Sequence, residues 1–500
     1  MPSPVRPRGA GGKTYLAFDF GAESGRAALA HLHSGVLTTE EVHRFGNEPV
    51  EYGTSLHWDA PRLWMEVRKA LAGLEELRLS GIGVDAWGVD YALLGERGEL
   101  LQNPFHHRDS RTRGVMEEVF RRVPKEEIYA ATGIQFMPIN TLYQLVAAKR
   151  DTPHLLGAAD CLVTIPDLFN YWLTGKALCE FTNATTTQLV NPVTRTWARE
   201  LMDRLGLPSS LPAPIVEAGS VIGPLLPSIT RATSLSGTPV IAPASHDTGS
   251  AVAAISARDG TAFISSGTWS LVGTELDSPA LTPQALLLNF SNEGGVCGST
   301  RLLKNVMGLW ILQCCRQSWA AQDQVYDYRE LMELAGREAS FRHLIDPDDK
   351  SFLRPPDMLA AIDQYCARTQ QPPPLRPGAY VRAIVESLAL KYRHVIRNLE
   401  HVSNKPITEI RVIGGGSKNR MLNQCTADAT GRRVLAGPAE AAALGNIAVQ
   451  ILATGEASSL DEVRAIVDRS FPTEVFEPID TDTWEAQIER FRHYTERTYA

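Results

Sequence analysis

YLAFDFGAESGRAALAHL (residues 15–32) and TAFISSGTWSLVGTEL (residues 261–276) share one pattern, on which the prediction of the fold rests. Each segment is an apolar run, a short turn containing glycine and serine, and a second apolar run. This order is typical of a β-hairpin. Because the second segment begins near the middle of the chain, the sequence suggests two related domains, although no residue-by-residue repeat is visible.

Strands and helices alternate after each of these segments. The stretch 58–77 has apolar residues at helical spacing behind Asp59 and Pro61, and 81–94 has the pattern of a buried strand, a tight connection and a second strand. In the second half we expect a long amphipathic helix at 380–402, strands at 409–415 and 433–437, and helices at 418–431 and 439–455. The alternation predicts α/β layers with a largely parallel sheet.

Two further stretches bear on the organisation of the chain. The segment 207–243 contains prolines and no pattern of a long helix, so we expect the chain to cross between the two domains there. The first residues are rich in proline and glycine and lack the apolar stretch of a signal peptide. They predict a disordered leader at 1–13.

The composition limits the classes of protein to which the chain can belong. Its 500 residues are enough for about two to four domains. With 44% hydrophobic and 21% charged residues it is typical of a soluble globular protein, and it has no apolar run of about 18 residues to span a membrane. The net charge of −8 and the pI of about 5.9 argue against a dedicated nucleic-acid-binding protein. An anionic substrate would therefore need a local cluster of donors.

The cysteines indicate the redox compartment. Their number is odd, and they show neither a CxxC motif nor a Cys/His spacing that would hold a metal. We expect them to be reduced thiols, mostly buried, in a cytosolic protein. The seven are Cys161, Cys179, Cys297, Cys314, Cys315, Cys366 and Cys425.

Three glycine-containing turns could bind phosphate. GAESG (21–25) follows Asp19, SSGT (265–268) lies in the second hairpin, and GGGSKN (414–419) joins an apolar strand to a helix. Backbone N–H groups in such turns can hold phosphate oxygens, and Asp19 could hold Mg²⁺ through water. Each turn could instead simply connect its two elements, but two such turns that face each other across a cleft would favour phosphate binding.

Two carboxylate-containing segments could act on a polar substrate. In ASHDTGSAV (244–252), Asp247 could cap a helix or take a proton from a substrate hydroxyl. In GVDAWGVD (83–90), Asp85 and Trp87 could belong to the core or form a polyol site. A Ser-His-Asp triad is excluded at 245–247, because neighbouring side chains diverge. GGKT (11–14) is no phosphate-binding P-loop, because Pro7 stands where its first glycine should be.

Taken together, the motifs resemble those of the FGGY family of carbohydrate kinases, in order and over nearly the whole chain after the leader. Within that family, the residues of these motifs are most similar to those of the branch that acts on L-rhamnulose. The matching segments are DFGAESGR (19–26), GIGVDAWGVD (81–90), HHRDSRT (106–112), TGIQFMPINTLYQL (132–145), IPDLFNYWLTG (165–175), EFTNATTTQLVN (180–191), ASHDT (244–248), SSGTWSLVG (265–273), NEGGVCGSTRLLKNVMGLWILQ (292–313) and GGGSKNRMLNQCTADATG (414–431).

The resemblance implies a two-domain α/β fold of the actin/Hsp70/ribonuclease H-like ATPase class, with a mixed sheet in each half and a catalytic cleft between the domains. It places a sugar-binding N-terminal domain at 14–246 and an ATP-binding C-terminal domain at 247–500. The implied reaction is the transfer of phosphate from ATP to the C1 hydroxyl of L-rhamnulose, which gives L-rhamnulose 1-phosphate and ADP. The implied setting is a cytoplasmic monomer or homodimer that takes part in L-rhamnose catabolism.

The resemblance also implies roles for individual residues. Asp247 would be the general base, and Asp19 and Asp85 would be carboxylates on the Mg²⁺ side, acting through water. The residues implied to contact the sugar are Gly88, His246, Asp247, Thr248 and Asn305, and those implied to contact ATP are Ala22, Glu23, Ser24, Gly25, Arg26, Thr268, Gln313 and Gly415. Glu23 adds negative charge to a phosphate-binding turn, so we expect its side chain to point away.

Other functions remain open at this stage. A different ketose, such as L-fuculose, L-ribulose or D-xylulose, differs from L-rhamnulose by hydroxyl stereochemistry or one methyl group, and a methyl is worth only about 1–3 kcal/mol in a pocket. A sugar sensor without catalysis is a second alternative, against which Asp247 argues. A polymerising actin-like ATPase is a third, against which the sugar-site residues argue.

Overall fold

The computed structural model describes residues 12–231, 233–258 and 260–496. Contacts divide the chain into two compact units, and each is described by itself. Unit 1 comprises residues 1–256, 275–302 and 441–471, and unit 2 comprises residues 257–274, 303–440 and 472–500. The expected domain boundary between residues 246 and 247 comes from the family resemblance, whereas the two units are defined by contacts. That boundary therefore stays a prediction. The expected leader lies outside the described residues, apart from Gly12 and from Lys13, which opens the first strand.

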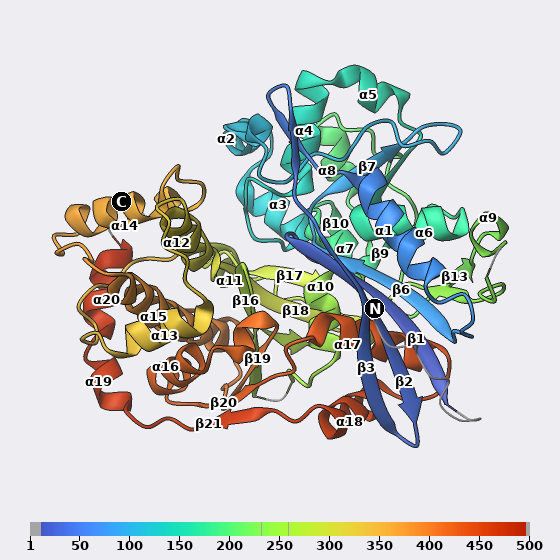
Figure 1. Ribbon diagram of the computed structural model, residues 1–500. Helices are drawn as coiled ribbons and strands as arrows, with labels where there is room; N and C mark the ends of the chain where they lie inside the picture. The colour runs from blue at the N-terminus through green and yellow to red at the C-terminus, as the bar shows by residue number, and fades with distance from the viewer. Residues whose placement is uncertain (1–11, 232, 259, 497–500) are drawn as a thin grey trace. The chain divides into compact units, whose positions relative to one another are not determined.

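Unit 1 is built on a mixed sheet in the order β13-β14-β6-β1-β2-β3 (Figure 1). β1 and β2 form the expected antiparallel hairpin, whereas β1 and β6 run parallel. These six strands are β1 (Lys13–Phe20), β2 (Ser24–His33), β3 (Val36–Gly46), β6 (Gly81–Ala86), β13 (Val221–Pro224) and β14 (Pro239–Ile241).

Helices cover both faces of this sheet because its central strand is apolar on both faces. Leu16, Phe18 and Phe20 of β1 pack in one buried cluster with side chains of α1 (Ala60–Ala72) and α6 (Ile165–Thr174). The alternate residues Tyr15 and Ala17 pack in another cluster with α17 (Ala441–Ala453) and α18 (Leu460–Ser470). The period of two along a strand separates these two sets.

The remaining elements of unit 1 lie outside this six-stranded sheet. β7 (Tyr91–Leu94), expected as a second strand after β6, pairs with β8 (Cys161–Thr164) in a separate small sheet. The others are β4 (Val50–Tyr52), β5 (Ser55–His57), α2 (Val115–Arg122), α3 (Lys125–Thr132), α4 (Thr141–Asp151), α5 (Pro153–Ala158), β9 (Cys179–Glu180), α7 (Phe181–Thr186), β10 (Val190–Asn191), β11 (Thr196–Trp197), α8 (Arg199–Arg204), β12 (Ile215–Val216), α9 (Pro227–Thr230), α10 (Asp247–Ala253), α11 (Pro283–Leu287) and β17 (Ser291–Gly294).

A second mixed sheet has the order β17-β18-β16-β15-β19-β20-β21, and all its strands except β17 lie wholly or partly in unit 2. β15 and β16 form the second expected hairpin, and β15, β19 and β20 run parallel. The last residues of β16 and the first residues of β18 belong to unit 1. The strands are β15 (Thr261–Ser266), β16 (Trp269–Leu276), β18 (Thr300–Met307), β19 (Glu409–Ile413), β20 (Arg433–Ala436) and β21 (Glu474–Phe476).

The helices of unit 2 pack around α15 (Pro377–Ser403). This helix begins with a proline in its first turn and ends at Asn404 in the left-handed conformation, and its inner face is buried, as the apolar periodicity predicts. The other helices are α12 (Trp310–Ala320), α13 (Tyr328–Gly336), α14 (Met358–Arg368), α16 (Arg420–Thr430), α19 (Thr481–Glu485) and α20 (Ile488–Glu496).

The observed elements confirm most of the predicted ones and differ from the predictions at three points. Helix α1 begins behind Asp59, whose side chain accepts a hydrogen bond from the Arg62 N–H, and it ends at Ala72, before the predicted end. The stretch 207–243 does not cross between units, because it lies within unit 1 and supplies β13 and β14 to its sheet. The sheets are mixed, as the resemblance implies, and not largely parallel.

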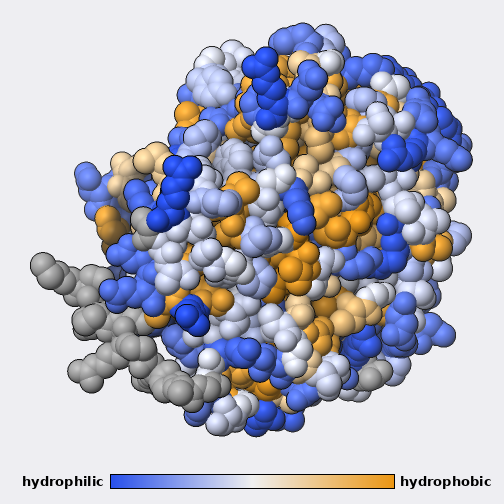
Figure 2. Space-filling view, turned by 90° about the vertical axis from the view of Figure 1, so that its right-hand side faces the viewer, coloured by the Kyte–Doolittle hydropathy of each residue, from blue (hydrophilic) through white to orange (hydrophobic). Residues whose placement is uncertain are grey.

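The seven cysteines are free, as expected, but only Cys179, Cys315 and Cys366 are fully buried. The prediction that most are buried is therefore wrong, and Cys297 is exposed. Figure 2 shows one face of the molecule, on which hydrophilic residues surround smaller hydrophobic patches. In the described part of the chain, no helix combines the length and the apolar character that crossing a membrane requires.

Candidate functional site

Three carboxylates gather at one edge of the unit 1 sheet. Asp19 is at the end of β1 and Asp85 at the end of β6, and the two are direct neighbours in the parallel register. Asp247 opens α10, shortly after the parallel strand β14. Because the carboxyl ends of parallel strands meet at the same edge, segments distant in sequence bring these acidic groups together, and such edges are where ligands bind in α/β folds.

Asp19 and Asp85 have different partners. Arg26, across the hairpin, donates from Nε and Nη2 to Asp19 Oδ2, at 2.9 and 2.5 Å. Asp85 is fully buried, and Asn446 of α17 donates to its Oδ2 at 2.6 Å. Burial, together with the charge of Asp19, raises the pKa of Asp85 well above its ordinary value. A close approach makes this contact possible, because a Cβ on Gly83 would lie 2.3 Å from Asn446 Oδ1.

Asp247 is the most accessible of the three carboxylates, with 31% of its side chain exposed. The Thr248 N–H donates to Asp247 Oδ1 at 2.5 Å, and the Thr248 hydroxyl donates to the same oxygen at 3.3 Å. Burial raises the pKa of Asp247, the charge of His246 opposes this shift, and the charge of Asp19 adds to it. The raised pKa means that a proton binds this carboxylate more readily than it binds an ordinary aspartate.

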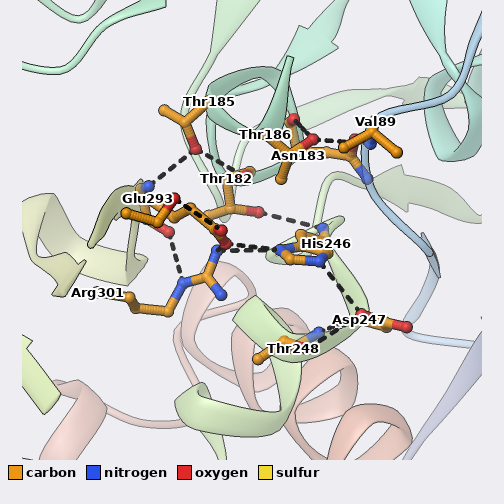
Figure 3. Close-up of polar contacts among 12 residues, drawn as sticks. Val89, Thr182, Asn183, Thr185, Thr186, His246, Asp247, Thr248, Glu293 and Arg301 are labelled. Carbon is orange, nitrogen blue, oxygen red and sulfur yellow. Dashed lines mark hydrogen bonds and ion pairs between the residues drawn. The ribbon is translucent and has the colours of Figure 1, made fainter. Parts of the chain in front are cut away.

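A buried polar network fixes the segment that carries Asp247. Ser245 donates to Glu180 Oε2 from its N–H at 2.9 Å and from its hydroxyl at 2.8 Å. Thr182 accepts the His246 N–H at 3.2 Å, as Figure 3 shows. Because Glu180 is itself fully buried, this network is rigid and leaves little freedom at the start of α10.

The His246 ring lies between two acidic side chains (Figure 3). Its Nε2 is 3.4 Å from Asp247 Oδ1, and its Nδ1 is 3.2 Å from Glu293 Oε2. Arg301, which is fully buried, has Nη2 3.1 Å from the same Glu293 oxygen. Burial would raise the pKa of Glu293, but Arg301 and His246 together hold it below its ordinary value, so Glu293 is an ionised carboxylate.

Gly88 lies in a tight turn that follows β6. A Cβ at this position would lie 2.9 Å from Thr186 Oγ1, and the neighbouring Val89 has a positive φ of 67°. The Val89 N–H donates to Thr186 Oγ1 at 2.9 Å (Figure 3). Packing against α7 therefore accounts for the glycine, and the turn lies beside the segment that leads to His246, since Ala86 forms a bridge to that residue.

The turn between β1 and β2 carries the residues expected to contact ATP in unit 1. The Gly21 N–H donates to the Ser24 carbonyl at 2.9 Å, and the Asn47 side chain donates to the Gly21 carbonyl at 2.8 Å. Glu23 is exposed, and the direction of its side chain stays a prediction. Ala22 is half-buried, and Gly25 packs closely against Phe45.

In unit 2, the corresponding edge carries hydroxyl and glycine groups. The Thr268 hydroxyl donates to Gln313 Oε1 at 3.5 Å, and the Thr268 carbonyl accepts the N–H groups of Gly308 and Trp310. Gly415 is exposed, and a Cβ added to it would have no neighbour within 4 Å. A Cβ on Gly416, in contrast, would lie 2.0 Å from Ser266 Oγ. Gly416 is thus required by packing, whereas Gly415 has open space beside it.

The structure brings the expected residues together in two sets. Asp19, Asp85, Gly88 and 246–248 share one edge of unit 1, and Thr268, Gln313 and Gly415 lie around the end of β15 in unit 2. Asn305 lies half-buried on β18 in unit 2 and is not placed against the unit 1 residues.

The carboxylates of Asp19 and Asp85 offer oxygen ligands of the kind that Mg²⁺ binds. The described residues contain no group of three or more His, Cys, Asp or Glu side chains arranged to hold a metal. Asp85 Oδ1 is a buried oxygen without a hydrogen-bond partner, and the nearby Asp19 repels it. Mg²⁺ is commonly bound by one or two carboxylates, with water and substrate phosphate as the other ligands. Asp19 and Asp85 fit that requirement.

Sequence reasoning assigned no role to Glu293, Arg301 or Asn446. Glu293 and Arg301 lie in a segment that otherwise consists mainly of glycines and apolar or small residues. Two opposite charges in a segment of this kind are a signal of a buried ion pair, which the structure shows. No local pattern identifies Asn446, because it contacts Asp85 from the far end of the chain.

Comparison with known proteins connects this geometry to a family. Residues 14–254 match the N-terminal domain of the FGGY family of carbohydrate kinases, and residues 262–454 match the C-terminal domain of the same family. A rhamnulokinase of Bacteroides thetaiotaomicron is 44% identical over 487 residues, which cover 96% of this chain and 99% of that protein. A rhamnulokinase of Bacillus subtilis is 40% identical over 474 residues, which cover 94% of this chain and 96% of that protein.

Solved structures of carbohydrate kinases share the fold. The gluconate kinase of Lactobacillus acidophilus matches with a TM-score of 0.81 and 19% identity, over 98% of this chain and 99% of that one. The glycerol kinase of Plasmodium falciparum with ADP matches with a TM-score of 0.76 and 15% identity, over 98% of each chain. The expected two-domain fold of the actin/Hsp70/ribonuclease H-like class is confirmed. Since the two family domains together match most of its length, this chain is a member of the FGGY family of carbohydrate kinases.

Proposed function

We propose that this ATP-dependent carbohydrate kinase is a rhamnulokinase, which transfers the γ-phosphate of ATP to the C1 hydroxyl of L-rhamnulose. The curated relatives support this substrate, since rhamnulokinases from distant bacteria are about 40–44% identical over nearly the whole chain. The products are L-rhamnulose 1-phosphate and ADP, and the reaction belongs to L-rhamnose catabolism.

Asp247 is the proposed general base, and the geometry of its carboxylate carries this assignment. Among the described residues, the side-chain and backbone donors that reach Asp247 all approach Oδ1. Oδ2 is therefore available to accept the proton of a substrate hydroxyl, on a side chain that is partly exposed. An aspartate suits this role, because a loose phosphoryl-transfer transition state needs proton removal only late.

The other site residues bind and orient the substrates. His246, Thr248, Gly88 and Asn305 are proposed to hold the sugar, so that its hydroxyl lies in line with the transferred phosphate. The ATP contacts are proposed to be Thr268, Gln313 and Gly415 in unit 2 and residues 22–26 in unit 1, where backbone N–H groups and Arg26 reduce the phosphate charge.

Mg²⁺, held by Asp19 and Asp85 through water, would supply positive charge beside the phosphates when bound. Asp19 would then be shared between that ion and Arg26, which already donates to it twice. We further propose a cytoplasmic monomer or homodimer. The alternative substrate is another ketose of this family, namely L-fuculose, L-ribulose or D-xylulose.

The test is the release of ADP, measured in a coupled assay with Mg-ATP and each of L-rhamnulose, L-fuculose, L-ribulose, D-xylulose and glycerol. The highest kcat/KM is expected with L-rhamnulose, and phosphorus NMR of its product is expected to show a phosphate on C1. A higher kcat/KM with another ketose would overturn the substrate and leave the kinase assignment in place.

A further inference from the structure

Four charged or titratable side chains of unit 1 form a row that ends at the proposed general base. The row runs from Arg301 on β18 to Glu293 on β17, then to His246 and Asp247 at the start of α10 (Figure 3). Successive pairs are separated by 3.1, 3.2 and 3.4 Å. Exposure of the side chains rises along the row, from 0% at Arg301 to 5%, 9% and 31% at Asp247.

The inner pair of the row determines what the His246 ring can do. Arg301 Nη2 lies 3.1 Å from Glu293 Oε2 and 3.2 Å from His246 Nδ1, so both members of the pair meet this ring nitrogen and hold it in place. With Nδ1 facing Glu293, the opposite nitrogen Nε2 is the one that faces Asp247. A carboxylate that fixes the ring orientation and protonation of a histidine is a known device in enzyme sites.

We propose that Glu293 and Arg301 are positioning residues, which hold the His246 ring with Nδ1 on Glu293 so that Nε2 faces the carboxylate of the proposed base Asp247. Neither residue needs to touch the sugar or ATP. This inference rests on the proposed function only in taking Asp247 as the base.

The charges around Asp247 make this arrangement useful. On the acidic side are Asp19 of β1 and Asp85 of β6, and on the basic side are His246 beside it and Arg301 of β18. Glu180 and Glu275 face Arg301 from other elements. Of these groups, the charge of His246 does most to oppose the effect of burial on the Asp247 pKa. The orientation of the ring therefore bears on how readily the Asp247 carboxylate binds a proton.

The test compares Glu293→Gln with a matched control, Glu275→Gln. Glu275 is also buried in unit 1 and forms an ion pair with a buried arginine, Arg464, at 2.6 Å, and its side-chain partners among the described residues are Arg464 and Ser299. A glutamine at 293 can donate to Nδ1 and leave the ring neutral. In Glu293→Gln, kcat/KM near pH 6 is therefore expected to fall several-fold further than it does near pH 9, because the acid limb of the pH profile moves upward.

Both substitutions leave a buried arginine without its partner and destabilise the fold. If Glu293→Gln does not fold, the double variant Glu293→Gln/Arg301→Met removes both charges and avoids that penalty. It is expected to show the same upward shift, because it also removes a cation near Asp247. The inference is wrong if the acid limb of every folded variant at these positions coincides with that of Glu275→Gln.

Asp247→Asn separates this inference from the proposed function. If that variant keeps wild-type kcat, Asp247 is not the base and the proposed mechanism fails. If it is inactive while Glu293→Gln and Glu275→Gln have the same pH profile, only the positioning role of Glu293 and Arg301 fails.

Discussion

In unit 1 the sheet order is β13-β14-β6-β1-β2-β3, and the second sheet has the order β21-β20-β19-β15-β16-β18-β17, with one strand more at its far edge. The strand directions also correspond, with an antiparallel hairpin, two parallel neighbours and an antiparallel edge strand in each. At the same edge, however, unit 1 presents three carboxylates, whereas unit 2 presents Ser266, Thr268 and the glycines at 414–416.

This difference shows how one scaffold can serve two chemical tasks. Carboxylates suit the acceptance of a proton and the binding of a cation, whereas glycines and hydroxyls suit the close approach of a nucleotide. The strands fix where the functional groups lie, and the residues at the strand ends determine what these groups do.

The largest effect is expected for Asp247→Asn, which removes the proton acceptor from the unit 1 edge. Asparagine has nearly the same size but accepts no proton, so kcat is expected to fall by about 10²–10⁴-fold. The Kd for ATP should change little. Both are measured by ADP release and calorimetric titration.

The matched control is Asp167→Asn in the same unit. Asp167 is also buried, and burial raises its pKa to about 7, so an uncharged amide is a mild replacement there. This control should keep wild-type kcat. If Asp247→Asn and Asp167→Asn have the same kcat, the unit 1 edge does not supply the proton acceptor, and the proposed division of tasks between the two edges is wrong.

The next effect concerns the metal requirement. Asp85→Asn removes a carboxylate that is proposed to bind Mg²⁺. Mutation of a residue that only hydrogen-bonds to a metal ligand already lowers the affinity for the metal by about 10–100-fold. The Mg²⁺ concentration for half-maximal rate is therefore expected to rise by at least about tenfold at fixed ATP. This concentration is measured by following the rate of ADP release at increasing Mg²⁺. An unchanged value would show that Asp85 does not bind the metal.

A pair of neighbouring glycines sharpens the account of the unit 2 edge. Gly416→Ala is expected to lower the free energy of unfolding by about 1–3 kcal/mol, because its Cβ would overlap Ser266 Oγ. Gly415→Ala should leave the Tm unchanged, since its Cβ meets open space, but should raise the KM for ATP. Thermal unfolding and nucleotide kinetics of the two variants distinguish packing from binding. Equal KM values in the wild type and Gly415→Ala would be evidence against the ATP contact.

The smallest effect is a shift in the pH profile. A proposed general base such as Asp247 acts in its ionised form, and burial raises its pKa, so kcat/KM should fall on the acid side at a higher pH than for an ordinary aspartate, about 3.9. Because Asp19 also raises this pKa, Asp19→Asn should move the acid limb to lower pH, whatever its effect on the maximal rate. A limb that moves upward in Asp19→Asn would contradict the proposed electrostatics.

The sequence predicted the two hairpins and the long helix α15 correctly, because their apolar periodicity is local. It failed at 207–243, where Pro224 and Pro239 are paired with each other at the ends of β13 and β14. Prolines are tolerated at such positions, so they did not mark a boundary between domains.

The candidate site was predicted less completely. Asp247 was singled out by its own segment, but only the family resemblance chose a base over a helix cap. Glu293 and Arg301 were missed because their partner His246 lies about fifty residues earlier in the chain, and no local pattern shows which glutamate will be buried beside it.

We propose that residues 246–248 and Gly88 of unit 1 hold most of the sugar, and that Thr268, Gln313 and Gly415 of unit 2 hold the nucleotide together with residues 22–26. Hydrogen–deuterium exchange with each ligand alone is the measurement that distinguishes the two sites. L-rhamnulose should slow exchange in peptides that cover 86–89 and 245–248, and ADP should slow it in peptides that cover 266–268 and 414–416. The account is contradicted if L-rhamnulose protects the unit 2 peptides and leaves 245–248 unchanged, or if ADP protects neither unit 2 peptide.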